Sequence, residues 1–115
     1  MKINAVKTVK KEFSSEVIKP SIKTGYQKNA IVSSEIIRKN TGTATLFAFD
    51  KGQGLSAHTA PFDALAVILD GKAEIFIGGR KYLVAKDEMI IMPAGTPHAL
   101  KASEKFKMLL VMIKS

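Results

Sequence analysis

The chain contains no cysteine among its 115 residues, so disulfides and thiolate metal sites are excluded and a cytoplasmic location is the default. Long apolar runs are also missing. MIIM at residues 89–92 and MLLVMI at 108–113 are far shorter than the ~20 residues that cross a bilayer. The N-terminal stretch MKINAVKTVKKEF has lysines but neither the apolar core nor the small-residue cleavage site of a secretory signal. We therefore expect a cytoplasmic protein with no membrane contact.

Acidic residues are scarce in the first forty positions, which hold nine Lys/Arg against three Asp/Glu, whereas residues 41–115 hold nine against seven, for a net charge of +8. A nucleic-acid interface would place arginine or aromatic side chains among the lysines, but this third of the chain has one arginine and two aromatic residues, Phe13 and Tyr26. We interpret the lysines as solvated surface and expect no nucleic-acid partner. An anionic small ligand or partner stays open.

Short apolar runs separated by turn residues dominate the chain from residue 43 onward. Two pairs, Asp70-Gly71 and Gly78-Gly79, separate such runs by two residues, as in type I′ hairpins, where both central positions need positive φ. Strands at this spacing predict an antiparallel sandwich or barrel. The expected strands are TATLFAFD, ALAVILD, KAEIFI, RKYLVA, MIIMP, HALKA and FKMLLVMIK.

The strands ALAVIL and MLLVMI are apolar at both parities, so both of their faces should be covered. This pattern favours a homodimer, with a second subunit or the N-terminal arm over the outer face. We expect a single domain, with residues 1–40 as an arm or edge strand on the barrel or dimer partner and residues 41–115 as the barrel. Within the arm, INAVKTV suits an edge strand, VKKEFSSEVIK a short helix or extended arm, and AIVSSEIIRK the first firm strand.

Two short motifs resemble those of the cupin family, whose small members fold as an all-β jelly-roll barrel, also called a double-stranded β-helix. The first family motif is Gly, five residues, His-x-His, three or four residues, Glu, six residues, Gly; here Gly52, His58 and Gly71 fall in register. The second is Gly, five residues, Pro-x-Gly-x-x-His, three residues, Asn, and PAGTPH supplies Pro93, Gly95 and His98. The resemblance covers roughly residues 43–113 and implies a site between the two histidines.

At four other motif positions this chain departs from the family. The family motifs imply four metal ligands, and this chain keeps only two of them, His58 and His98. The departing residues are Ala60, Ala64, Asp87 and Ala102. Asp63 is the nearest spare carboxylate, but alternation along a strand would turn it away from His58 unless a bulge at Pro61 turns it inward. A site of His58, Asp63 and His98 would suit a divalent metal such as Fe, Mn, Ni or Zn. Alternatively, Asp63 caps or bonds backbone amides in the APFD turn, and the histidines bond backbone groups or each other and hold the pocket mouth closed.

Parity also outlines a ligand pocket. Phe47 and Phe49 share one face of TATLFAFD, and Met89 and Ile91 share one face of MIIM, so either pair could line the barrel. If both histidines face inward, three alanines leave space beside them and Leu100 adds an apolar wall. The expected pocket is therefore mostly apolar with two imidazoles, as suits a small organic ligand. Its predicted lining is Phe47, Phe49, Ala60, Ala64, Met89, Ile91, Leu100 and Ala102.

These features leave three kinds of function open. One is a metal-dependent enzyme, an isomerase, decarboxylase or dioxygenase, in which the ion acts as a Lewis acid or oxygen-activating centre. Another is a cupin that binds or senses a small molecule without metal or turnover. The third is an interaction role for the basic arm. A carboxylate close to both histidines would favour the enzyme, whereas an apolar cup would favour binding. The catalytic residues and the substrate stay unknown from the sequence.

Overall fold

The computed structural model describes residues 6–10 and 13–114, which form nine β-strands and one short helix. The alternating pattern of apolar and turn residues thus produces the all-β chain that the sequence predicts. No helix in these two described ranges is long and apolar enough to span a bilayer. The elements are β1 (Val6–Lys10), α1 (Pro20–Lys23), β2 (Ile31–Lys39), β3 (Gly42–Phe49), β4 (Gly54–His58), β5 (Asp63–Ile77), β6 (Arg80–Ala85), β7 (Met89–Met92), β8 (His98–Lys101) and β9 (Phe106–Ile113).

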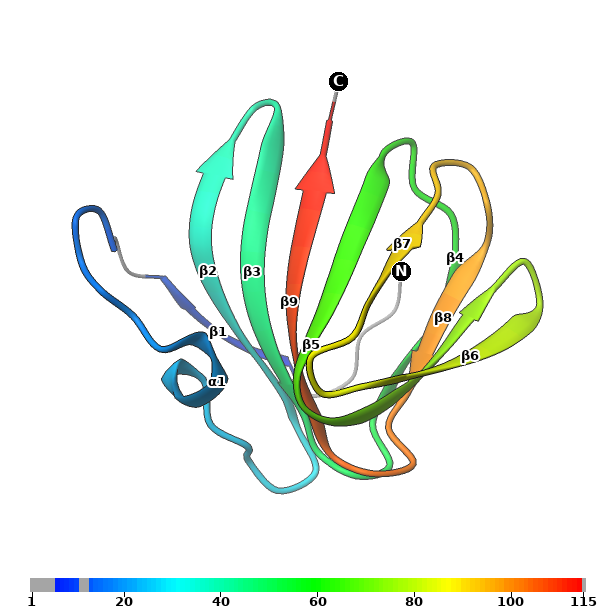
Figure 1. Ribbon diagram of the computed structural model, residues 1–115, viewed down its shortest axis with the longest axis horizontal. Coiled ribbons are helices and arrows are strands. Elements are labelled where there is room, and N and C mark those ends of the chain that lie inside the picture. Colours follow the sequence, from blue (N-terminus) through cyan, green and yellow to red (C-terminus); the bar gives the residue numbers. More distant parts are fainter. Residues whose placement is uncertain (1–5, 11–12, 115) are drawn as a thin grey trace.

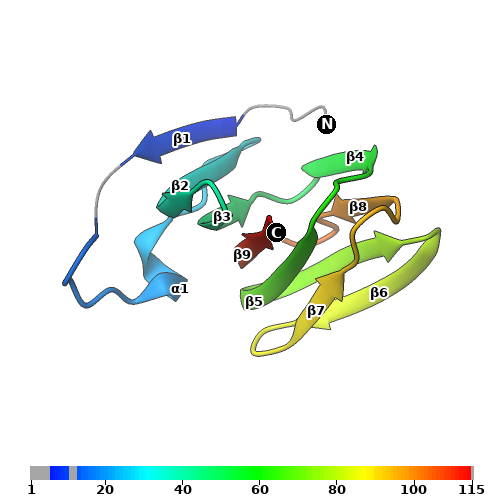
Figure 2. The same cartoon turned by 90° about the horizontal axis from the view of Figure 1, so that it is seen from above.

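The strands form two hydrogen-bonded layers that curl around a common interior (Figure 1). The larger sheet runs in the order β1-β2-β3-β9-β5-β7, and the smaller one in the order β4-β8-β5-β6. Seen from above, the two layers open away from each other like the sides of a V, with β5 belonging to both (Figure 2). All pairs are antiparallel except β1 with β2, which are parallel.

The fifteen-residue strand β5 is the corner that joins the layers. Its first part pairs with β9 and β7, and its second part, from Lys72 to Ile77, pairs with β6 and β8. The expectation of a hairpin at Asp70-Gly71 is therefore wrong, because the strand continues through a register shift between Ile68 and Asp70. Gly71 has φ +71°, and a Cβ there would lie 2.1 Å from the carbonyl oxygen of Lys105. Gly71 thus lies beside a bulge at the corner between the two sheets. In the sequence, the residues of such a bulge look the same as those of a two-residue turn.

The second glycine pair does close a hairpin. Ile77 pairs with Arg80, and the two residues between them, Gly78 and Gly79, have φ +59° and +82°. Positive φ at both central positions matches the right-handed twist of the flanking strands, so this two-residue loop fixes the β5–β6 register.

The N-terminal segment lies against the larger sheet. β1 extends that sheet beside β2, while α1 lies over its outer side near β3 and β9 (Figure 2). The Tyr26 hydroxyl donates a hydrogen bond to Asp70 at 2.6 Å, and the Lys107 ammonium donates one to the carbonyl of Ser21 at 2.9 Å. Burial and this bond to Asp70 raise the pKa of Tyr26. The predicted boundary at residue 40 falls inside the antiparallel pair β2–β3.

Within the arm, the expected edge strand is present as β1, and AIVSSEIIRK supplies β2. Residues 3–5 of INAVKTV and residues 11–12 lie outside the described residues. From residue 13 to residue 19 the chain has a turn at Ser14-Ser15 but no helix, and the one helical turn begins only at Pro20. Proline is well suited to the first turn of a helix because its missing N–H has no partner there anyway.

Candidate functional site

His58 and His98 face each other at the top of the barrel interior, at the ends of β4 and β8. They are direct cross-strand partners, because a register shift between Leu55 and His58 inserts one extra residue into β4. Their ring centroids lie 4.3 Å apart with an interplanar angle of 72°, an edge-to-face contact. The prediction that the two imidazoles share one pocket agrees with this geometry.

The backbone fixes the proton position on each ring. Nδ1 of His58 lies 2.9 Å from the carbonyl oxygen of Ser56, and Nδ1 of His98 lies 3.2 Å from that of Thr96. A carbonyl oxygen only accepts, so each Nδ1 must carry the hydrogen. In the neutral ring the lone pair then belongs to Nε2, which becomes the atom that can accept a proton or bind a ligand.

His98 is the more buried of the two histidines, with 5 % of its surface exposed, whereas His58 is half-buried. Burial lowers the pKa of His98 below its ordinary value, and the neighbouring His58 lowers it further, because a second positive charge nearby is unfavourable. The hydrogen bond to Thr96 opposes this shift but does not outweigh it. At neutral pH His98 is therefore an uncharged imidazole.

Asp63 is not brought to the histidines as a third ligand. Its Oδ1 accepts a hydrogen bond of 2.8 Å from the backbone N–H of Ala94, inside PAGTPH. Gly95, at φ +77°, donates from its N–H to the Ala60 carbonyl at 2.8 Å. Asp63 and Ala60 thus hold the turn that delivers His98 to the pocket. The alternative role of Asp63 is thus met in kind, since it accepts from a backbone amide, but the partner lies in PAGTPH and not in the APFD turn where it was expected.

Residues 58–64 do not form one strand, so side chains there do not alternate between faces as the sequence predicts. β4 ends at His58, residues 59–62 form a bend around Pro61, and β5 begins at Asp63. Within the described ranges, no group of three His, Cys, Asp or Glu side chains is placed to hold a metal ion. The donors do not fit the predicted three-ligand divalent site, because the carboxylate that would complete it is engaged at the turn.

A cavity of about 280 Å³ opens beside the two rings, between the larger sheet and β4 and β8. Of the predicted lining residues, Phe47, Ala60, Ala64 and Leu100 line it together with both histidines. The lining is mostly apolar, and no acidic or basic side chain other than the histidines belongs to it within the described residues. The lining that the sequence reasoning missed is Thr45, Leu55, Thr59, Phe62, Met92, Met108, Leu110 and Met112.

Four predicted lining residues lie elsewhere. Phe49 is fully buried in the core, where its ring stacks on Phe106 with centroids 4.5 Å apart. Ala102 is also buried in the core but does not border the cavity. Met89 and Ile91 were placed on the wrong face: they point outward with 68 % and 60 % of their surface exposed.

The inward face of β7 carries Ile90 and Met92 instead. These two residues pair with Ala66 and Ala64 of β5, which are buried, and cross-strand partners share a face. Because MIIM is apolar at every position, alternation alone could not select the inward pair. The register with β5 makes Met92 a cavity residue.

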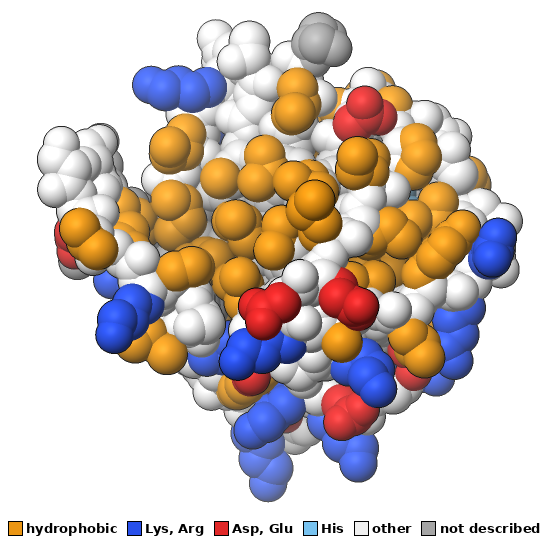
Figure 3. Space-filling model, in the orientation of Figure 1, with side chains coloured by type: hydrophobic (Ala, Val, Ile, Leu, Met, Phe, Trp, Pro, Cys, Tyr) orange, Lys and Arg blue, Asp and Glu red, His pale blue; other side chains and the backbone are white. Residues whose placement is uncertain are grey.

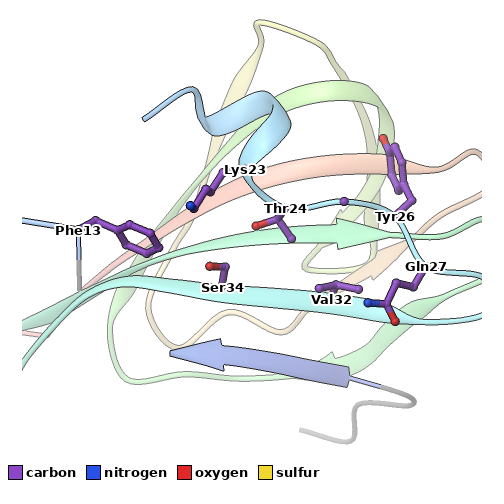
Figure 4. Close-up of a pocket in the computed structure, with 8 residues that line it drawn as sticks. Phe13, Lys23, Thr24, Tyr26, Gln27, Val32 and Ser34 are labelled. Atoms are coloured by element: carbon purple, nitrogen blue, oxygen red, sulfur yellow. The ribbon is translucent and has the colours of Figure 1, made fainter. Parts of the chain in front are cut away.

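A second hollow, of about 360 Å³, lies between the N-terminal segment and the outer face of β2 (Figure 4). It is larger than the barrel cavity, but its Lys23 and Tyr26 side chains already have contacts. The Lys23 ammonium lies 4.8 Å from the Phe13 ring centroid, and the Tyr26 hydroxyl turns away from the other labelled residues toward Asp70 (Figure 4). Among the residues that line this hollow, Thr24 has a buried hydroxyl without a hydrogen-bond partner in the part of the chain that the structure describes. The barrel cavity, with two paired acceptors, is the better candidate site.

Comparison with known proteins identifies the family. The family model described as a cupin domain matches residues 45–114. A conserved protein of unknown function from Streptococcus pyogenes is 39% identical, with a TM-score of 0.84, over 88% of this chain and 89% of that one. A cupin 2 conserved barrel domain protein from Leptotrichia buccalis is 41% identical, with a TM-score of 0.76, over 78% of this chain but only 44% of that longer chain.

A cupin superfamily protein from Desulfitobacterium hafniense shares the fold at 24% identity, with a TM-score of 0.80 over 89% of this chain and 93% of that one. No curated protein matches the sequence. The curled two-layer sheet therefore agrees with the jelly-roll barrel that the motifs implied. The family model and the Streptococcus relative together show that this chain belongs to the cupin family.

Proposed function

We propose that the barrel binds a small, mostly apolar organic molecule through hydrogen bonds to His58 and His98, without turnover. The observation that carries this proposal is the engagement of both Nδ1 atoms by backbone carbonyls, at 2.9 Å and 3.2 Å. It leaves Nε2 as the free acceptor of each imidazole when the ring is neutral, inside a mostly apolar lining. A pocket of this kind favours ligands with a compact apolar body and a hydroxyl or N–H donor.

Size and charge narrow the ligand class to molecules such as substituted phenols. A cavity of about 280 Å³ has room for one aromatic ring with small substituents, since ~150 Å³ already holds benzene. A phenol donates a hydrogen bond to neutral imidazole. A carboxylate of equal size would bring a charge out of water and find no cationic partner fixed in the lining, with the hydroxyls of Thr45 and Thr59 as the side-chain donors beside the imidazoles, so its burial would be unfavourable at neutral pH.

Paired variants of His98 test the proposed acceptor. The side-chain amide of asparagine reaches about as far as Nδ1, so His98→Asn can still donate to the Thr96 carbonyl but lacks the distal acceptor. Glutamine reaches about as far as Nε2, so His98→Gln keeps an acceptor there. A substituted phenol and the matching benzoate, titrated by ligand-observed NMR, serve as probes. We expect the phenol to bind, the benzoate not to bind, and His98→Asn to weaken phenol binding about tenfold relative to His98→Gln.

Equal affinity of the two variants, or preference for the benzoate at neutral pH, would contradict the proposal. Extraction of the purified protein followed by mass spectrometry then searches for the natural ligand among compounds of this class. A matched control is Met89→Leu, which changes an exposed residue of β7 outside the cavity.

A soft metal ion is a second candidate, because three thioethers line the same cavity as the imidazoles: those of Met92, Met108 and Met112. Thioether and imidazole donors suit Cu(I) better than they suit Mg, Ca or Mn. Thioethers carry no charge, and an imidazole binds a metal ion in its neutral form. The desolvation penalty of an ion grows with the square of its charge, so a monovalent ion is far less costly here than a divalent one lacking a carboxylate.

Elemental analysis of protein purified without a chelator or a histidine tag separates the two candidates. A copper content near one ion per chain that is lost in Met92→Leu but kept in Met89→Leu would favour the metal. Zinc, iron or manganese held at full occupancy by the histidines would contradict both proposals made for the cavity.

A further inference from the structure

The hollow between the N-terminal segment and β2 is separate from the barrel cavity, since no described residue lines both. Its floor is the outer face of β2. Ile31 belongs to the core, so by alternation Val32 and Ser34 point outward. Phe13 and residues 23–27 form the walls. At about 360 Å³ the hollow has the size of a small-molecule site, since such sites measure about 300–1,000 Å³.

Three polar side chains meet beside the Phe13 ring, at one end of this hollow. Figure 4 shows the Lys23 ammonium and the hydroxyl oxygens of Thr24 and Ser34 turned toward the same space. An ammonium group only donates hydrogen bonds, and a hydroxyl can donate as well as accept. No Asp or Glu is present among the described residues that line the hollow. This end of the hollow therefore favours a negatively charged group that has several acceptor atoms.

Two of these side chains have unused bonding capacity. Thr24 is 4 % exposed, and its hydroxyl has no hydrogen-bond partner in the described part of the chain. Folded proteins bond nearly all buried polar groups, because an unpaired group has given up its bonds to water without replacement. The exposed Lys23 contacts the Phe13 ring but forms no ion pair with a described acidic residue. A ring contact is weak at an exposed site, so a bound anion competes with it easily.

We propose that this hollow binds a small organic phosphate monoester, with its phosphate group between Lys23, Thr24 and Ser34. A phosphate group presents three terminal oxygens in different directions, so it accepts from three residues at once. A carboxylate presents two oxygens in one plane and leaves one of the donors without a partner. Hydrogen bonds to a charged acceptor are also stronger than neutral ones. The apolar side chains of Phe13 and Val32 contact the organic part, which favours an ester over inorganic phosphate.

The charges around the hollow also favour an anion. The ammonium groups of Lys105 and Lys107 lie 4.7 Å and 4.9 Å from the ring centroid of Tyr26, which lines the hollow, and Asp70 is the acidic partner of Tyr26. With Lys23, three ammonium groups thus stand against one carboxylate. In Figure 3, Lys and Arg side chains, with Asp and Glu among them, gather in the lower half of the face, around α1. A phosphate monoester carries about 1.5 to 2 negative charges at neutral pH, more than one lysine balances.

Phenyl phosphate is the probe, titrated with the full chain and followed by ³¹P NMR. We expect it to bind, and Lys23→Met to weaken binding at least about tenfold through loss of the charged donor. Lys28→Met changes an exposed lysine of the same segment outside the hollow, so this matched control should bind like the wild type. Ser34→Ala and Thr24→Val should each weaken binding about three- to tenfold. Inorganic phosphate, which lacks the apolar part, should bind at least about tenfold more weakly than the ester.

The free protein gives a second readout for the unpaired hydroxyl. Without ligand, Thr24→Val should unfold at the same temperature as the wild type or higher, because valine keeps the shape and removes a buried polar group that has no partner. Circular dichroism confirms that each variant is folded. A lower unfolding temperature of Thr24→Val would overturn the role given to this hydroxyl.

Several results would overturn the site itself. One is no binding of phenyl phosphate at millimolar concentration, and another is an equal loss in Lys23→Met and Lys28→Met. Binding that is kept in Lys23→Met but lost in His98→Asn would place the ester in the barrel cavity instead. Benzoate or inorganic phosphate that binds as tightly as phenyl phosphate would contradict the proposed ligand class.

Discussion

The two faces of β9 differ in what covers them, although both are apolar. Met108, Leu110 and Met112 point inward and line the cavity, whereas Leu109, Val111 and Ile113 point outward. Met108 is 1 % exposed and Ile113 is 59 % exposed. On the inner face the opposite layer of the barrel covers the strand and leaves a pocket, while on the outer face the N-terminal segment lies near Lys107 and leaves Ile113, at the other end, exposed. The inner face of β9 therefore lines the candidate ligand cavity, whereas the outer face is exposed at the end of the strand.

The largest expected effect comes from truncating the inner face. Met108→Ala removes buried apolar atoms and leaves a void, which should lower the free energy of unfolding by about 2–5 kcal/mol. Ile113→Ala on the outer face should cost below ~1 kcal/mol when measured in urea at concentrations where the protein is monomeric. Similar losses for the two variants would show that the faces do not differ in burial.

The pH dependence of stability tests the inner site. Because the folded-state pKa of His98 lies below its unfolded value of 6.5, the unfolded chain binds the proton more readily. The stability that the neutral His98 contributes to the folded chain is fully present above pH 6.5, and it is lost as the pH falls through the folded-state pKa of His98. His98→Leu should flatten this acid loss in urea titrations from pH 7.5 downward. A free energy of unfolding of the wild type that rises as the pH falls from 7.5 would contradict a buried neutral imidazole at His98.

The turn that carries His98 should respond to Asp63. Asp63→Ala removes the 2.8 Å bond to the Ala94 N–H and should cost about 1 kcal/mol, because the acceptor is charged but exposed. Glu104→Ala, another exposed acidic residue, is the control and should have almost no effect. Asp63→Ala should also leave the metal content of the purified protein unchanged. Loss of a bound metal in Asp63→Ala would reinstate the three-ligand site.

The smallest effect is expected at the N-terminal segment. Tyr26→Phe removes the hydroxyl that donates to Asp70 and should destabilise the chain by about 0.5–1 kcal/mol. Limited proteolysis should show faster cleavage between β1 and β2, with the barrel left intact. Tyr82→Phe, whose ring contacts Arg80 on the other sheet, is the matched control. Unchanged cleavage in Tyr26→Phe would mean that this bond does not hold the segment.

Much of the fold follows from the sequence because its signals are local. The seven expected runs from residue 43 onward all contain strands, and Gly78-Gly79 forms the predicted hairpin. The prediction of a hairpin at Asp70-Gly71 was wrong because a bulge at a sheet corner needs the same backbone freedom as a turn. The extra residue between Leu55 and His58 was equally invisible, since a bulge in β4 leaves no compositional trace.

The site depended on longer-range information. Pairing of His58 with His98 came from family motifs rather than from strand alternation. The partner of Asp63 lies 31 positions away, in the turn before His98, so no local pattern around APFD could reveal it. Met92 could be told from Met89 only through the register with Ala64 and Val67. The inward parity of β9 could have indicated Met108 and Met112 as lining residues, had the thioethers been read as more than core filler.

The most direct test of the central claim is the tautomeric state of the two imidazoles. Long-range ¹⁵N–¹H correlation spectra of histidine-labelled protein at neutral pH distinguish a proton on Nδ1 from one on Nε2. We expect His98 to be neutral and the neutral form of each ring to carry its proton on Nδ1, with the Nε2 resonances shifted when a substituted phenol is added. A neutral form of either ring with its proton on Nε2 would contradict the paired acceptors on which the proposed function rests.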